Sequence, residues 1–296
     1  MASYTGISVA SSLGDISVTV LSGDVELAAQ QQFPLERFCN YQGWNQSGLV
    51  VQVPQDPTVT MNTVVQTSAS TPVDATTTFD MSNAQITISM KAVDVNVYTH
   101  SLIAAGNAPE PLIKDSMTKA YIRNRASNFM ALYTAAPTAN VVGESGTAIS
   151  HDGSFLTALQ LLATNAAEGD LFWILASTQI SEFGRDTHFK NWHASGLQLL
   201  AQNIVLPSGF LGVSPAGVEV YWNNHYTASS GNHGMMFSKN AIRCYDQVPL
   251  KIEMDMSEMW VRDRVVRIGA TTMYGLGSAR DGGSTGTNLW ICDVVS

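Results

Sequence analysis

The strongest constraint on the fold is one long helix predicted between Pro109 and Pro137, in the stretch PEPLIKDSMTKAYIRNRASNFMALYTAAP. Glu110 and Asp115 suit the first turn of a helix, as do the early prolines, and Pro137 stops it. Apolar side chains recur at helical spacing, at Ile113, Met117, Tyr121, Ala126, Phe129, Met130 and Tyr133. The prediction is a helix over about 110–135, roughly 36 Å long at 1.5 Å per residue, which is long for a globular protein.

Two β-rich runs precede the helix, TVTMNTVVQT (58–67) and AQITISMKAVDVNVYTH (84–100), with a Thr/Ser-rich segment between them. They predict a long two-stranded excursion. Because isolated two-stranded ribbons are marginally stable in water, something outside this hairpin must hold it. Residues 1–50 show no sustained period beyond a short helical possibility at 25–32, so we expect an extended arm there.

Residues 150–245 alternate between helical and extended patterns. Helices are predicted over 153–169, ending at Gly169, and over 177–186, beginning with a Ser/Thr cap. Buried strands are predicted over 170–177 and 217–225. This alternation indicates a compact α/β subdomain.

A strictly alternating segment, LKIEMDM (250–256), predicts a half-buried strand near the end of the chain. Its apolar face is set against a charged one, with Leu250, Ile252, Met254 and Met256 opposed to Lys251, Glu253 and Asp255. The following residues, 260–275, are β-rich, and a helical turn over 257–262 stays open as an alternative. The chain as a whole is therefore expected to be α+β.

The composition is short of charge. Charged residues make up 13% of the 296, against roughly 25% in an average soluble domain. Such a surface needs covering by other subunits, which indicates a large assembly. The net charge of −9 and the absence of any Lys/Arg run argue against a protein that holds nucleic acid by neutralising phosphates.

Targeting and redox signals are also weak. The N-terminus lacks a basic region followed by an apolar core, so no secretory signal is expected, and no stretch approaches the roughly 18 apolar residues of a membrane helix. The cysteines, Cys39, Cys244 and Cys292, are odd in number and far apart. We expect them to be reduced, partly buried thiols in a chain that folds in a cytoplasm.

Three short motifs could carry chemistry, and each has a simpler interpretation. Gly275 and Gly277 suggest a dinucleotide loop, but a third glycine is missing and only about 19 residues follow, so a glycine turn at a strand end is predicted. Asp186, His188 and His193 suggest a metal, but the two histidines are five positions apart.

The third motif, GESGTAISHDG, places Ser145 near His151 and Asp152. It lacks the Gly-x-Ser-x-Gly elbow of a hydrolase, so a polar loop is predicted.

A charge cluster close to the C-terminus is the last feature of note. Carboxylates and guanidinium groups occur there within one short region, at Glu253, Asp255, Glu258, Arg262, Arg264 and Arg267. Catalysis would need a carboxyl group with a raised pKa, and neighbouring arginines lower it. A solvated or inter-subunit salt-bridge surface is therefore predicted.

The order of parts resembles the major capsid protein of tailed bacteriophages, the Hong Kong type fold, and looks most like the short-tailed phages. The local resemblance is carried by FSKNAI (237–242) and RIGATTMYGLGSARDGG (267–283). It implies an N-terminal arm at 1–50, an E-loop at 51–95, a P-domain at 96–147 and 246–296 that contains the long spine helix, and an A-domain at 148–245.

The resemblance also implies the function. The protein would assemble with itself into pentamers and hexamers of an icosahedral virion shell, formed in the host cytoplasm around DNA that it does not recognise specifically. Expected partners are a separate scaffolding protein, a portal protein and a cement or decoration protein, without a membrane, catalytic residue, cofactor or metal. Inter-subunit contacts are predicted at Gln66, Thr67, Thr71, Asp74, Thr77, Phe79, Arg123, Arg125, Glu253, Asp255, Arg262, Arg264 and Arg267.

Two departures from the family pattern shape further expectations. Residues 56–90 contain no Lys and no Arg, which argues against the covalent E-loop crosslink of the best-known member. Nothing before residue 50 is charged or helical enough for a cleaved scaffolding segment, so no maturation cleavage is expected. The alternatives are an encapsulin-type nanocompartment shell, a virion adhesin or decoration protein and, third, an enzyme.

Overall fold

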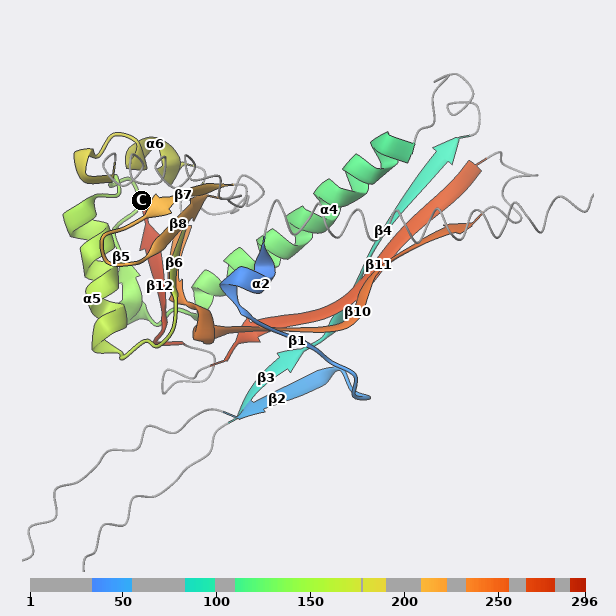
Figure 1. Cartoon of the computed structure of the whole chain (residues 1–296), viewed down its shortest axis with the longest axis horizontal. Coiled ribbons are helices and arrows are strands. Elements are labelled where there is room, and N and C mark those ends of the chain that lie inside the picture. The colour runs from blue at the N-terminus through green and yellow to red at the C-terminus, as the bar shows by residue number, and fades with distance from the viewer. Residues whose placement is uncertain are drawn as a thin grey trace, which may run out of the picture.

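Two β-sheets and one long helix form the frame of the molecule (Figure 1). The computed structural model describes residues 34–54, 83–98, 110–176, 178–189, 209–222, 233–255, 265–279 and 288–296. Within these ranges, no helix combines the length and the hydrophobicity needed to cross a membrane.

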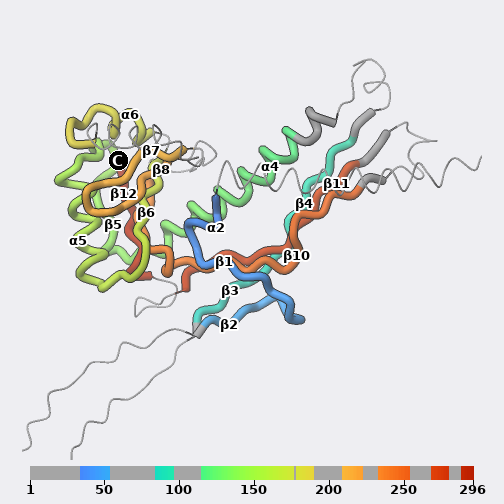
Figure 2. The backbone as a smooth tube through the Cα atoms, viewed as in Figure 1, coloured from blue at the N-terminus to red at the C-terminus, as the bar shows by residue number. Residues whose placement is uncertain are grey.

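The first sheet has four strands in the order β1-β10-β11-β4. β10 (Ile242–Asp255) and β11 (Val265–Ser278) are antiparallel, β4 (Ser89–Tyr98) pairs with β11, and β1 (Asn40–Gly43) runs parallel to β10. The predicted alternation is confirmed, because Leu250 and Ile252 are buried while Lys251 and Glu253 are exposed. Register shifts between Asp246 and Lys251 mark a bulge, and the long strands bend along their length (Figure 2).

The long predicted helix is present as α4 (Glu110–Met130), and the chain continues through a 3-10 helix, η1 (Ala131–Ala135). α4 lies along the four-stranded sheet (Figure 1). Its buried side chains share one core cluster with the sheet's inner face, and they include Met117, Tyr121, Ile122, Ala126, Phe129 and Met130. The helix is thus held by packing along one face.

The second sheet has six strands in the order β5-β12-β9-β6-β8-β7. Their bounds are Val141–Val142, Ile291–Val295, His233–Ser238, Leu171–Leu175, Glu219–Trp222 and Phe210–Val213. The strands predicted over 170–177 and 217–225 appear as β6 and β8. Short 3-10 helices, η2 (Thr138–Asn140) and η4 (Lys239–Ala241), lead into β5 and β10.

Helices α5 (Leu156–Thr164) and α6 (Gln179–Phe183) accompany the six-stranded sheet. The helix predicted over 153–169 begins instead in a π turn, η3 (His151–Phe155), and its end at Gly169 is wrong. Asn165 donates its amide to Leu289 O, and Ala166 adopts a left-handed φ of 51°, so the chain leaves the helix there. Thr178 makes no side-chain cap for α6, and Ser177 lies outside the described residues.

Residues 34–43 are part of the main core rather than an extended arm. Phe38, from the short helix α2 (Leu35–Phe38), is 1% exposed and makes ring contacts with Phe129, Phe172, Tyr221 and Phe237. The sequence-based expectation of an arm is therefore wrong for this part. Residues 1–33 lie outside the described residues.

The hairpin predicted before the long helix divides between two sheets. β3 (Asn83–Thr87) pairs with β2 (Val50–Pro54), whereas the residues from Ser89 onward join the large sheet as β4. Dividing the run places β4 at the edge of a four-stranded sheet, which has the support that a lone two-stranded ribbon lacks. The run at 58–67 lies outside the described residues, and β2 and β3 form what we call the hairpin stem.

Candidate inter-subunit surfaces and the groups that position them

The predicted contact residues fall into four groups. Six of them, Gln66, Thr67, Thr71, Asp74, Thr77 and Phe79, lie outside the described residues, as do Arg262 and Arg264. Arg123 is exposed on α4, and Glu253 is exposed on β10, where its carboxylate lies 2.5 Å from Lys251 Nζ. Asp255 and Arg267 occupy directly opposed positions of β10 and β11.

Arg125 differs from the others because it is buried within the chain. Its Nη2 donates to Asp246 Oδ2 at 2.9 Å, and both side chains are less than one-tenth exposed. Tyr41 Oη donates to the same oxygen at 2.5 Å, so β1, α4 and β10 meet at one carboxylate. We call these three residues the buried junction, and Arg125 is not kept among the proposed inter-subunit contacts.

Aromatic rings complete the surroundings of the guanidinium. It lies 4.5 Å from the ring centroid of Tyr121 and 5.2 Å from that of Tyr274. Burial alone would lower the pKa of Arg125, but its interactions with Tyr121 and Asp246 outweigh this and raise it. The pKa of Tyr41 is raised by burial and by its hydrogen bond to Asp246. The Arg125 guanidinium therefore stays charged at any physiological pH.

Two of the three glycines of β11, Gly275 and Gly277, serve close packing. The predicted glycine turn is wrong, because Gly275 and Gly277 lie inside the strand. A Cβ at Gly275 would sit 2.9 Å from Thr87 O, and one at Gly277 would sit 2.8 Å from Ile86 Cγ1. The hairpin stem crosses β11 at this point, which we call the glycine notch, and only glycine leaves room for it.

Apolar side chains anchor the stem above the notch. Val51, Val53, Ile86 and Ile88 form a small core with Tyr245, and Trp44 packs against that core. On the other side of the stem and at its base, large apolar side chains are exposed: Leu49 by 53%, Val50 by 48% and Met90 by 61%. We call these three the stem patch, and the other exposed large hydrophobic residues in the described part of the chain are Val141 and Leu156.

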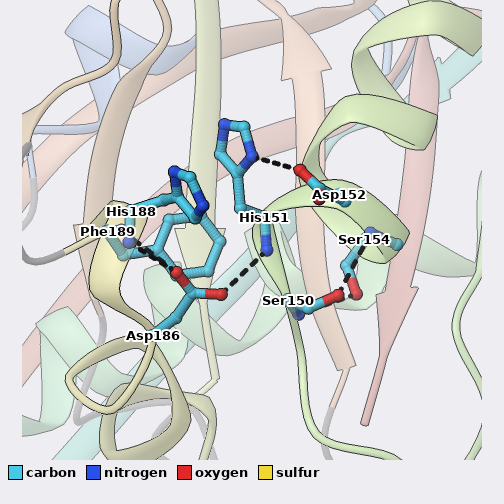
Figure 3. Close-up of polar contacts among 8 residues, drawn as sticks. Ser150, His151, Asp152, Ser154, Asp186, His188 and Phe189 are labelled. Carbon is cyan, nitrogen blue, oxygen red and sulfur yellow. Dashed lines mark hydrogen bonds and ion pairs between the residues drawn. The ribbon is translucent and has the colours of Figure 1, made fainter.

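Residues of two motifs singled out in the sequence, Asp186 with His188 and His151 with Asp152, lie side by side near α5 (Figure 3). His151 Nδ1 lies 2.7 Å from Asp152 Oδ1, and the rings of His151 and His188 stack with centroids 4.8 Å apart. Asp186 accepts backbone N–H groups from His151, His188 and Phe189. Its carboxylate thus accepts backbone N–H groups from two separate segments of the chain.

No group of three or more metal-ligating side chains occurs among the described residues, and His193 lies outside them. Ser145 lies in an exposed turn closed by the hydrogen bond from Thr147 N–H to Glu144 O. This agrees with the predicted polar loop.

One ion pair and one histidine–carboxylate contact connect further elements of the fold. Arg37 forms a two-point pair with Glu219 at 2.6 and 2.9 Å, which ties α2 to β8, and its hydrogen bonds to Glu219 raise the pKa of Arg37. His233 Nδ1 lies 2.9 Å from Asp293 Oδ2, and the ring of Tyr133 stacks on His233. Burial raises the pKa of Asp293, although His233 opposes this.

The three cysteines are free and buried. A hydrogen bond with Cys244 and burial both raise the pKa of Cys39, and burial raises the pKa of Cys292 to about 12. Thiols with such pKa values stay protonated and are poor nucleophiles.

Comparison with known proteins gives a clear answer at the level of fold. No protein family and no curated protein sequence matches the chain. Solved structures do match over most of both chains. The capsid of Ralstonia phage GP4 aligns with a TM-score of 0.62 at 9% identity, over 87% of this chain and 86% of that one. The chain has a phage capsid fold.

Two other structures agree with this. The head of Helicobacter pylori bacteriophage KHP40 has a TM-score of 0.59 at 12% identity, over 89% of this chain and 90% of that one. The capsid of cyanophage P-SCSP1u has a TM-score of 0.54 at 16% identity, over 88% and 87%. The buried junction, the glycine notch and the stem patch are thus parts of a subunit with the capsid fold, and its α+β class is as expected.

Proposed function

We propose that this chain is the major capsid protein of a tailed phage and assembles with itself into the pentamers and hexamers of an icosahedral shell around double-stranded DNA. One observation carries the proposal: the capsid fold extends over nearly nine-tenths of the chain, and the matching chains are covered to the same extent. The low charge content supports it, because a charge-poor surface suits a subunit that neighbours cover.

The proposed contacts between subunits use what the folded chain leaves open. The stem patch presents Leu49, Val50 and Met90 to a neighbour, and burying apolar side chains of this size contributes about 1.5–3 kcal/mol each. The predicted E-loop contacts within residues 66–79 lie, in the sequence, between β2 and β3 of the same hairpin. Arg123 and the charge pairs of the β10–β11 segment, Arg262 and Arg264 included, supply the polar part of the contacts.

The acidic balance supports a container role. A chain with a net charge of −9 does not hold DNA by phosphate neutralisation, so packaged DNA would slide against the wall without specific recognition. A separate scaffolding protein during assembly, a portal protein at one vertex and a cement or decoration protein are the partners proposed with this role. Assembly in the host cytoplasm before residence in the virion belongs to the same proposal.

Electron microscopy of the expressed chain, with and without the phage's candidate scaffolding protein, tests the proposal. Uniform closed shells are expected, and a dependence on the scaffold would support the expected separate scaffolding protein. The double variant Val50→Asp/Met90→Asp should keep the melting temperature of the wild-type monomer but form no shells. A wild-type chain that stays monomeric under both conditions would contradict the capsid role.

A second candidate with the same fold is an encapsulin-type compartment. The content of particles purified from the natural source separates the two roles. Enclosed DNA supports the phage capsid, and an enclosed enzyme supports the compartment.

A further inference from the structure

The buried junction contains two polar atoms that have no partner within the protein. Among the described residues, Arg125 Nε and Asp246 Oδ1 are buried and make no hydrogen bond to another protein atom. The side chains that carry them are 8% and 6% exposed. A buried donor or acceptor without a hydrogen bond is costly, so such groups are nearly always paired with protein atoms or with ordered water. These two atoms therefore call for a partner that the chain itself does not supply.

The more exposed pair of Arg37 and Glu219 shows the contact that is incomplete at the junction. Arg37 Nη2 donates to Glu219 Oε1 at 2.6 Å and its Nε donates to Oε2 at 2.9 Å, while Tyr221 Oη donates to Oε2 at 2.7 Å. At the junction, Arg125 makes the Nη2 contact with Asp246 but not the Nε contact. The two sites thus combine the same three kinds of group and differ by one hydrogen bond.

Two donors on a single oxygen explain the difference. Tyr41 Oη at 2.5 Å and Arg125 Nη2 at 2.9 Å both donate to Asp246 Oδ2, and they come from β1 and α4. These donors together fix the rotation of the carboxyl group. The regular pairing of β10 with β11 is also interrupted directly after Asp246, and a bulge of this kind redirects a side chain. Oδ1 therefore makes no hydrogen bond with Nε, although both atoms border the same contact.

We propose that the buried junction binds one water molecule, which accepts a hydrogen bond from Arg125 Nε and donates one to Asp246 Oδ1. Nε is only a donor and a carboxyl oxygen accepts, and a water molecule serves both at once. Nε lies on the same side of the guanidinium as Nη2, as the Arg37 pair shows, so it faces the carboxyl group.

An ion suits this position less well than water does. An anion would be repelled by the carboxylate, and a cation would be repelled by the guanidinium. A neutral water molecule meets neither repulsion and satisfies both unpaired atoms. α4 and β10 are then joined by one direct and one water-mediated hydrogen bond, and the second is nearly as favourable in enthalpy as the first.

A density map of the full wild-type chain that resolves ordered water tests the proposal, and its result does not depend on the capsid role. A peak is expected within hydrogen-bond distance, about 2.6–3.2 Å, of both Arg125 Nε and Asp246 Oδ1. A direct hydrogen bond between these two atoms would overturn the proposal. So would a map that shows other buried waters but no peak at this position.

Magnetic relaxation dispersion of the solvent gives a second measurement, because it counts the long-lived internal waters of a protein in solution. The double variant Arg125→Met/Asp246→Leu should hold about one such water fewer than the wild type. The matched control, Asp115→Ala/Lys119→Ala, removes an exposed pair and should keep the wild-type number. An equal number in the folded junction variant and the wild type would contradict the proposal, and the wild-type map decides if that variant does not fold.

Discussion

At the scale of single residues, the buried junction determines how three elements meet. Asp246 Oδ2 receives Tyr41 from β1 and Arg125 from α4, while Asp246 itself belongs to the bulged part of β10. A buried ion pair adds little net stability over apolar side chains of the same size. Removing one partner is costly, however, because the other charge is then buried alone. The junction therefore specifies an arrangement more than it strengthens it.

Replacing Arg125 by alanine should lower the free energy of unfolding by about 3–5 kcal/mol, because Asp246 is left uncompensated. The double variant Arg125→Met/Asp246→Leu should recover most of this loss, since it removes both charges and keeps the volume. Urea unfolding followed by circular dichroism measures both. The control is Lys119→Ala, which breaks an exposed pair with Asp115 and should cost about 0.5 kcal/mol or less.

If Arg125→Ala lowers the free energy of unfolding no more than Lys119→Ala does, this account of the junction is contradicted.

Part of the junction could be read from the sequence. Arg125 stands four positions after Tyr121 and four before Phe129, on the apolar face of the helix, and that spacing signals a buried arginine. Its partner could not be found, because Asp246 lies 121 positions away and no local pattern links the two. Phe38 shows the same limit, since its ring partners come from four distant segments.

At the scale of elements, the glycine notch fixes where the hairpin stem lies. β3 crosses β11 so closely that Thr87 O fills the space of a side chain at Gly275, and the Ile86 side chain fills that space at Gly277. The stem's own small core then locks it in place. A displacement of the hairpin stem would therefore also displace β11 and the long sheet on which it packs.

The variant Gly275→Ala should destabilise the stem by about 1–3 kcal/mol, because its methyl group meets the backbone oxygen of Thr87 and two isoleucine side chains. The rate of amide hydrogen exchange should rise at residues 83–88 and stay unchanged in β6. The matched control is Gly269→Ala in the same strand, whose methyl group meets only Asp94 Oδ1 at the end of a movable side chain.

Equal exchange of residues 83–88 in the two glycine variants would show that the notch does not hold the stem.

Elements with a strong local period could be predicted, and those defined by distant pairing could not. The alternation of Leu250 to Glu253 and the apolar spacing around Tyr121 predicted β10 and α4. The division of the hairpin run at Ile88 was missed, because it depends on β11 offering an edge to β4. The glycines were taken for a turn, since the sequence does not reveal that β3 crosses them.

At the scale of the whole molecule, the described part of the chain has two large cores, the small core of the hairpin stem and the exposed stem patch. One core lies between α4 and the long sheet, the other between the six-stranded sheet and its helices. The stem patch remains exposed. In the proposed shell, such surfaces would make many weak contacts repeated by symmetry, without a covalent bond between subunits.

Denaturing gel electrophoresis of purified particles should therefore give one band at the mass of a single chain. The reason is the absence of Lys from residues 56–90, where a crosslink of the family's known kind would need an amine. Particles boiled with and without reductant should give the same pattern, because all three cysteines are buried and free. A ladder of covalent multimers would contradict the prediction.

The pairing of β1 with β10 has a consequence for how the protein is made. Asn40, the first residue of β1, donates a hydrogen bond to Asn240, 200 positions later, and β12 inserts between β5 and β9 after both have been synthesised. A ribosome adding about 5–20 residues per second thus exposes Leu35 and Phe38 for on the order of ten seconds or longer before their partners emerge. Chains with such remote pairings fold slowly, so a chaperone or another subunit has time to meet them unfolded. If the chain assembles as proposed, folding and assembly would compete during the first minute after synthesis.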